Sequence, residues 1–132
     1  MSPFLIVLVV LLGLFVFFQI GFYIKSKKTV GQQIPFDKIE SEFLDKIKDK
    51  KGFVYFHSPT CHNCKNQTPI VEKLKEKFSS IISVDVSKNL QTARALNVMG
   101  TPSIVFFGGN EIKGYYVGVK DENFLIEKMN NL

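Results

Sequence analysis

The chain has 132 residues and a formal net charge of +5, from 17 lysines and arginines against 12 acidic residues. Three of the cations, Lys25, Lys27 and Lys28, directly follow a long apolar run. The other 14 lie in residues 36–132, which also contain all 12 acidic residues. The domain-sized part is therefore nearly neutral, which argues against nucleic acid as a partner. Its 97 residues are enough for one small domain with a single core.

Residues 3–24 are uncharged and almost entirely apolar. As a helix they would be about 33 Å long, enough to cross the hydrocarbon core of a bilayer. A cleavable signal peptide fits poorly, because no basic segment precedes the run and no Ala-x-Ala site follows it. We therefore expect a retained transmembrane anchor that ties the chain to a membrane.

The lysines after the anchor set the expected orientation. The positive-inside rule keeps Lys25, Lys27 and Lys28 in the cytoplasm and places the domain on that side. The alternative is a signal-anchor with an extracytoplasmic, for example periplasmic, domain, since one flank of three lysines is the only charge signal. Residues 25–35 are expected to form a basic juxtamembrane linker that holds the domain just off the membrane.

Two elements are predicted before the cysteines. Apolar residues recur at helical spacing over residues 36–47, which predicts an amphipathic helix that ends near Gly52. The apolar run at 53–57 predicts a buried strand, and the Ser-Pro-Thr sequence after it ends that strand. Thr60 is the expected N-cap of a long helix from Cys61 to about Phe78.

The only two cysteines form the segment Cys61-His62-Asn63-Cys64. In the first turn of a helix, sulfurs at this spacing are close enough to bond to each other. Unpaired backbone N–H groups and the helix dipole would favour the thiolate form of Cys61. Cys61 is then the expected attacking sulfur, and Cys64, one turn deeper, the expected resolving thiol.

Metal binding and an inert structural pair are the alternatives for these cysteines. Zinc sites normally have four ligands, and the nearby candidates are His57 and His62, but His62 follows Cys61 directly and would point elsewhere. Haem attachment needs a histidine directly after the second cysteine, where Lys65 stands. A Cys-x-x-Cys pair beside a βαβ pattern favours redox chemistry.

The rest of the chain continues an α/β pattern. Pro69 lies inside the long helix and is expected to kink it. A second buried strand, parallel to the first, is predicted at 81–86, and a short helix around 90–96. The segment Met99-Gly100-Thr101-Pro102 precedes a strand at 103–107. A Gly-Gly-Asn turn then leads to an antiparallel strand at 111–118, and a last helix begins at Asp121.

This order of elements and motifs resembles the thioredoxin family from about Phe36 to Leu132. The resemblance implies a thioredoxin-like α/β fold, with a central mixed sheet of about four strands flanked by helices, here preceded by one transmembrane helix. Pro69 matches the kinking proline of the family's helix, and Gly118 matches the glycine after its last strand. Thr101-Pro102 matches the family's cis-proline loop, which implies that both residues bind the substrate chain.

Three departures from the family pattern change what is expected at the site. Thioredoxins usually have Trp-Cys-Gly-Pro-Cys, whereas this chain has Thr60 before Cys61, His62-Asn63 between the cysteines, and no tryptophan. The family's buried aspartate is replaced by Tyr55, and its partner lysine by Ser83. Proton transfer at Cys64 must then use water or another residue.

His62, Thr60 and His57 are candidates for tuning the reactivity of Cys61. A protonated His62 would stabilise the thiolate and make the disulfide more oxidising. The alternative is that His62 is a solvated side chain with little influence. His57, at the end of the strand, is expected to form part of the rim around the sulfurs.

The sequence thus predicts a membrane-anchored thiol–disulfide oxidoreductase acting on protein disulfides. It needs no cofactor beyond the Cys61–Cys64 disulfide and binds no metal. With no third cysteine, an external thiol reductant or oxidant protein must regenerate the pair. Two other functions remain open: a membrane-tethered metal-delivery module using Cys61, Cys64 and His57, and a non-catalytic adaptor that binds peptides at Thr101-Pro102.

Overall fold

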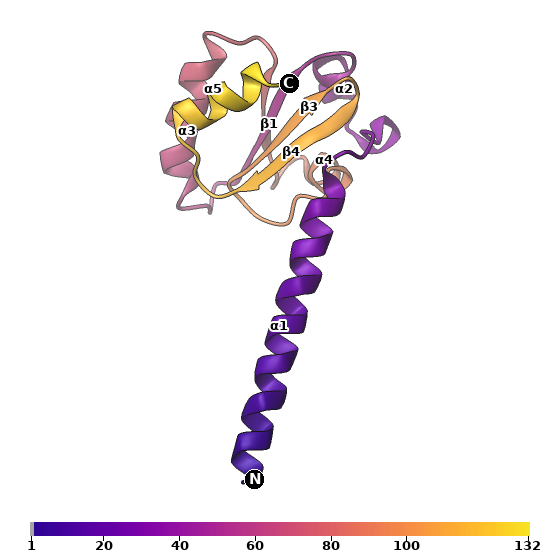
Figure 1. Ribbon diagram of the computed structural model, residues 1–132. Coiled ribbons are helices and arrows are strands. Elements are labelled where there is room, and N and C mark those ends of the chain that lie inside the picture. Colours follow the sequence, from indigo (N-terminus) through magenta and orange to yellow (C-terminus); the bar gives the residue numbers. More distant parts are fainter. Residues whose placement is uncertain (1) are drawn as a thin grey trace.

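The computed structural model describes residues 2–132, with residues 25–28 described by their backbone alone. A long helix, α1 (Pro3–Thr29), precedes a domain of four strands, helical elements and the loops between them (Figure 1). The domain elements are η1 (Phe36–Lys38), α2 (Ser41–Ile47), β1 (Gly52–His57), α3 (Cys64–Lys75), β2 (Ile81–Asp85), α4 (Leu90–Ala95), β3 (Ser103–Gly108), β4 (Glu111–Val117) and α5 (Glu122–Asn130).

The four strands form one mixed sheet in the order β2-β1-β3-β4. β1 and β2 are parallel, whereas β3 is antiparallel to both β1 and β4. At the turn between β3 and β4, Gly109 and Asn110 both have positive φ, the backbone that the Gly-Gly-Asn sequence favours. The predicted four-stranded mixed sheet is therefore confirmed, with β1 in its interior.

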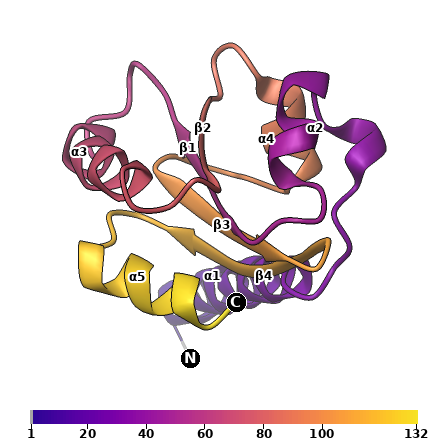
Figure 2. The ribbon, with the colours of Figure 1, turned by 90° about the horizontal axis from the view of Figure 1, so that it is seen from above.

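Helices cover both faces of the sheet (Figure 2). Side chains alternate along β1, so that Val54 and Phe56 pack with Phe43 and Ile47 of α2, whereas Phe53 and Tyr55 pack with Val71 and Leu74 of α3. Leu125 of α5 joins the second cluster. β1 is thus buried on both faces, and its last residue leads directly into the cysteine segment.

The predicted single helix over residues 36–47 is wrong in one respect, because the structure breaks it into η1 and α2. Ile39 and Glu40 between them are extended, with ψ of 139° and 137°. Glu40 is held there by Thr92 of α4, whose hydroxyl and backbone N–H both donate to its carboxylate, at 2.5 and 3.3 Å. This contact bridges 52 residues, and helical spacing alone does not reveal it.

The segment expected as a linker at 25–35 is also different, because α1 continues to Thr29 and the residues after it are docked on the domain. The Gly31 N–H donates to the Ile112 carbonyl at 2.7 Å, and the Ile112 N–H donates to the Gln32 carbonyl at 2.9 Å. Ile34 is buried. Residues 31–34 therefore add to the edge of β4 instead of forming a free tether.

Candidate redox site

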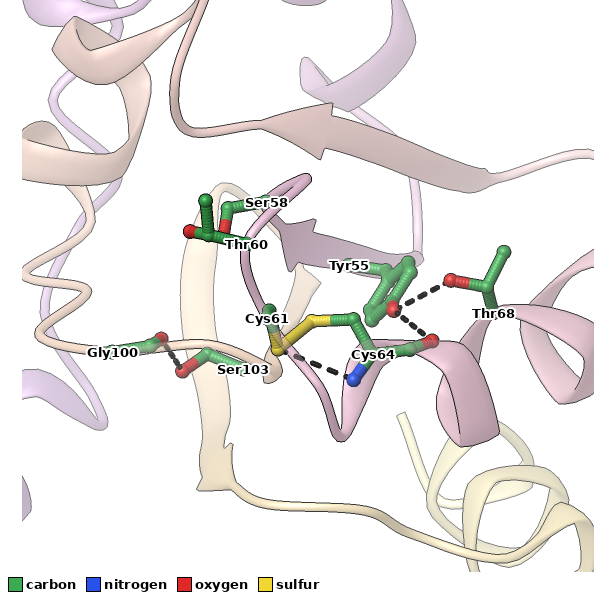
Figure 3. The surroundings of a disulfide bond; sticks show 8 residues. All are labelled: Tyr55, Ser58, Thr60, Cys61, Cys64, Thr68, Gly100 and Ser103. Atoms are coloured by element: carbon green, nitrogen blue, oxygen red, sulfur yellow. Dashed lines mark hydrogen bonds between the residues drawn. A yellow bond between two sulfur atoms is a disulfide. The ribbon is translucent and has the colours of Figure 1, made fainter.

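The cysteine segment joins the end of β1 to the start of α3, and the two cysteines are disulfide-bonded with their Cα atoms 5.3 Å apart (Figure 3). The helix begins at Cys64 and not, as predicted, at Cys61, because residues 59–60 and 62–63 form turns. Thr60 is therefore not the N-cap. Its hydroxyl lies 3.3 Å from that of Ser58, and Asn63 occupies the cap position.

The two sulfurs have different environments. Cys61 is partly exposed, whereas Cys64 is only 4% exposed. The backbone N–H of Cys64, the first residue of α3, donates to Cys61 Sγ at 3.2 Å. A helix N-terminal N–H aimed at a sulfur stabilises negative charge there. The arrangement thus favours a thiolate at Cys61, although Cys61 precedes the helix itself.

Tyr55 lies behind Cys64, at the position of the family's buried aspartate. Its side chain is fully buried, and its hydroxyl donates to the Cys64 carbonyl at 3.3 Å and lies 2.9 Å from Thr68 Oγ1. A carbonyl only accepts, so Thr68 must donate to the Tyr55 oxygen. Burial raises the pKa of the Tyr55 phenol above its ordinary value. A neutral phenol therefore stands where a carboxylate is expected.

Ser83, expected at the position of the family's lysine, lies next to Tyr55 in the parallel β1–β2 register. Its hydroxyl oxygen is buried without a hydrogen-bond partner among the described residues. Neither side chain of this pair is charged at neutral pH. Within the described residues, no buried ion pair therefore stands at the Tyr55–Ser83 position behind the cysteines.

The Thr101–Pro102 peptide bond is cis, and Pro102 is buried. Ser103, the next residue, pairs with Phe56 near the end of β1, which brings the 101–102 bond to the end of the sheet that carries the cysteines. Figure 3 shows Gly100 and Ser103 in the surroundings of the disulfide. The Gly118 N–H donates to the Pro102 carbonyl at 2.9 Å, from a backbone with φ of 94° that favours glycine.

The two histidines are placed differently. His57 stacks on Tyr55, with ring centroids 5.3 Å apart, and lies beside Asp85 in the strand register. The pKa of Asp85 is lowered mainly by the two hydrogen bonds from Ser87, and further by electrostatic interaction with His57 and Lys88. His57 also lines a surface hollow with Cys61 and Cys64, as expected for a rim residue. His62 is exposed, and its tuning role stays a prediction.

Thr68 is a site residue that the sequence analysis missed. It follows Cys64 by four residues on α3, so it lies on the same face of the helix, one turn further along. The spacing of four residues between Cys64 and Thr68 is the feature of the sequence that could have identified Thr68. Within the described residues, no group of three or more histidine, cysteine or acidic side chains is placed to hold a metal ion.

Comparison with known proteins assigns the domain to a family. A family model described as Thioredoxin matches residues 35–131. This chain belongs to the thioredoxin family. A thioredoxin from Staphylococcus saprophyticus is 30% identical over 91 residues, which cover 67% of this chain and 88% of that protein.

Other relatives are much longer than this chain. It is 35% identical over 77 residues to a putative protein disulfide-isomerase of Schizosaccharomyces pombe, yet these cover only 15% of that protein. The residues that match NADPH-dependent thioredoxin reductase 3 of Arabidopsis thaliana cover only 13% of that protein. Among solved structures, a mutant thioredoxin from Halobacterium salinarum superposes with a TM-score of 0.59 at 27% identity, covering 77% of this chain and 86% of the other.

Proposed function

We propose that this protein is a membrane-anchored thiol–disulfide oxidoreductase that reduces, or exchanges, protein disulfides through Cys61 and Cys64. The observation that carries the proposal is the contrast between the two sulfurs. Cys61 is reachable and accepts a helix N-terminal N–H, whereas Cys64 is buried behind it and bonded to it. Family membership supports the same chemistry.

In the reduced protein, the Cys61 thiolate attacks one sulfur of a substrate disulfide and displaces the other as a thiolate. This gives a mixed disulfide between Cys61 and the substrate. The Cys64 thiol then loses its proton to water, and the resulting thiolate attacks Cys61 Sγ and displaces the second substrate sulfur. Substrate leaves as a dithiol after two electrons have passed to it, and the Cys61–Cys64 disulfide remains. A protein dithiol outside this chain must reduce that disulfide again.

Thr101 and Pro102 are proposed to bind the substrate chain beside the disulfide. Proline has no backbone N–H, so the carbonyl and N–H of Thr101 are the backbone groups available for pairing with an extended peptide. Thr101 is partly exposed and lies at the same end of the sheet as the cysteines, which supports that role.

Residues 3–24 are proposed to be the membrane anchor. α1 is long and apolar enough over Pro3–Ile24 to cross a bilayer, with none of that stretch buried against the domain. Lys25, Lys27 and Lys28 favour a cytoplasmic domain by the positive-inside rule, and their side chains lie outside the described part of the structure. On the cytoplasmic side the protein would act as a reductase, and an exported domain would serve disulfide formation or reduction there.

An insulin-reduction assay with the full chain in nanodiscs tests this function. With a small dithiol as electron source, the full chain should accelerate the precipitation of insulin chains. Cys61→Ser should abolish the acceleration, whereas Ser79→Ala, an exposed substitution in the turn before β2, should leave it unchanged. Equal rates for the full chain and Cys61→Ser would contradict the proposal.

A further inference from the structure

α1 meets the sheet edge without a free linker between them. Thr29 at its end is only 4% exposed, and residues 31–34 are hydrogen-bonded along the start of β4. The long helix is therefore joined to the domain edge through docked residues. Because the helix continues directly into the apolar run, the domain cannot tumble freely above a bilayer that this run spans.

The strand directions bring the redox loops to one end of the sheet. β1 and β2 are parallel, and β3 runs opposite to β1 and β4. The ends of β1, β2 and β4 therefore meet the start of β3. This end carries residues 58–63 and the Thr101–Pro102 bond. Figure 1 shows α1 leaving the domain past this same end, and Figure 2 shows α1 behind β4.

Met99, two residues before Thr101, is 44% exposed and lines an open groove beside α1. Its side chain shares an apolar groove with one face of the helix, formed by Leu14, Phe17, Phe18, Gly21 and Phe22. All five belong to the apolar run that ends at Ile24. At 1.5 Å per residue they lie about 3–15 Å inside that end of the run. If the run ends at the surface of the hydrocarbon core, Met99 would therefore lie in the outer part of that core, next to the lipid–water boundary.

Other side chains at this end also suit a lipid–water boundary. Three further large apolar residues on the loops and strand end are strongly exposed, namely Leu90 at 47%, Val117 at 51% and Val119 at 41%. Lys88, two residues before Leu90, and Lys65, directly after Cys64, are exposed as well. Exposed apolar groups flanked by lysines favour contact with a membrane surface.

From this placement we propose that the disulfide exchanged with Cys61 belongs to an integral membrane protein and lies at the lipid–water boundary. This inference rests on the proposed function and names its substrate class. The step is the exchange described above, with two electrons passing from the Cys61–Cys64 dithiol to the disulfide of the membrane protein. A soluble substrate would have to enter between the redox loops and the bilayer, so it is disfavoured.

A single-turnover experiment in nanodiscs tests the proposal with the full chain reduced beforehand. One probe is a transmembrane peptide with a disulfide loop directly outside each end of its apolar segment, so that its orientation does not matter. The second probe carries the same loops on long Gly/Ser spacers. After normalisation to reduction by dithiothreitol, we expect the boundary disulfide to react about tenfold faster or more, because its effective concentration at Cys61 is higher.

The matched control is a full chain with a flexible Gly/Ser segment inserted between Val30 and Gly31, which frees the domain from the direction of α1. This variant should reduce both probes at similar rates. A separate depth measurement uses spin labels in a Cys61→Ser, Cys64→Ser background. A label on Met99→Cys should collide with lipid-soluble oxygen, and one on Lys50→Cys, at the opposite end of the sheet, with a water-soluble nickel complex.

Equal reduction of both probes by the full chain, or a Met99 label as water-exposed as the Lys50 label, would overturn the membrane-facing substrate class and leave the oxidoreductase function standing. Failure to reduce either probe would instead overturn the proposed function, and the substrate class with it.

Discussion

The hydroxyl of Tyr55 stands behind Cys64 where a thioredoxin has a carboxylate. It donates to the Cys64 carbonyl and accepts from Thr68, so its own proton is already engaged in positioning the first turn of α3. Burial raises the pKa of this phenol, and it is neutral at physiological pH. We therefore expect Tyr55 to act as a positioning residue, and water or another residue to take the proton of Cys64.

Replacing Tyr55 with phenylalanine should therefore destabilise the protein without changing the pH dependence of exchange. Loss of the hydroxyl removes its hydrogen bonds to the Cys64 carbonyl and to Thr68, and we expect the free energy of unfolding to fall by about 1–2 kcal/mol. Denaturation and the pH profile of alkylation of Cys61 measure the two effects. Tyr116→Phe is the control for removing a hydroxyl on the same face. A moved pH midpoint would show that Tyr55 takes part in proton transfer.

The raised pKa of Tyr55 also predicts a loss of stability at alkaline pH. The pKa of Tyr55 in the folded state lies above its unfolded value of about 10. The stabilisation that the neutral Tyr55 phenol provides is therefore complete below about pH 10, and it is lost as the pH rises through the folded-state pKa. Unfolding measured between about pH 9 and 11 should show a smaller decline for Tyr55→Phe than for the unchanged chain. Parallel declines would indicate that other groups control alkaline unfolding.

At the scale of elements, contacts between distant segments decide where helices begin and end. Glu40 accepts from the hydroxyl and backbone N–H of Thr92, while its own N–H donates to the Thr92 hydroxyl at 3.2 Å. These bonds tie the break between η1 and α2 to α4. Where η1 ends and α2 begins therefore depends on a side chain of another helix, α4.

Thr92→Val should loosen this junction. The variant keeps the shape of a fully buried side chain but removes the hydroxyl, leaving Glu40 with one donor fewer. We expect a loss of about 1–3 kcal/mol in the free energy of unfolding. Thr92→Ser, which keeps the hydroxyl, should lose less. If both variants lose the same amount, the methyl group and not the hydrogen bonds stabilises the junction.

The strands and the disulfide segment could be predicted because their signals are local. The apolar runs at 53–57 and 103–107 and the Gly-Gly-Asn turn need no knowledge of distant residues. The start of α3 at Cys64 was missed, since turns at 59–60 and 62–63 replace the expected first helical turn. The break at Glu40 and the docking of residues 31–34 on β4 were missed because their partners lie far away in the sequence.

For the whole molecule, the direction of α1 links the proposed membrane anchor to the placement of the candidate redox site. If residues 3–24 span a bilayer, the full chain should resist extraction from vesicles at alkaline pH. An arginine at Leu12 and another at Val16 should release part of the protein, because each costs about 2.5–3.5 kcal/mol near the centre of a spanning helix. Leu12→Ala with Val16→Ala is the matched control. Full extraction of the unchanged chain would exclude an anchor.

Disulfide trapping with the full chain tests thiol–disulfide exchange at Cys61 most directly. Reduced Cys64→Ser protein is mixed with a disulfide-containing peptide, and the products are analysed by mass spectrometry without reductant. We predict a stable mixed disulfide on Cys61, and in the same assay complete release of reduced peptide by the unchanged chain, whose Cys64 resolves the intermediate. Cys64→Ser protein that remains unmodified under these conditions would contradict the assignment of Cys61 as the attacking thiol.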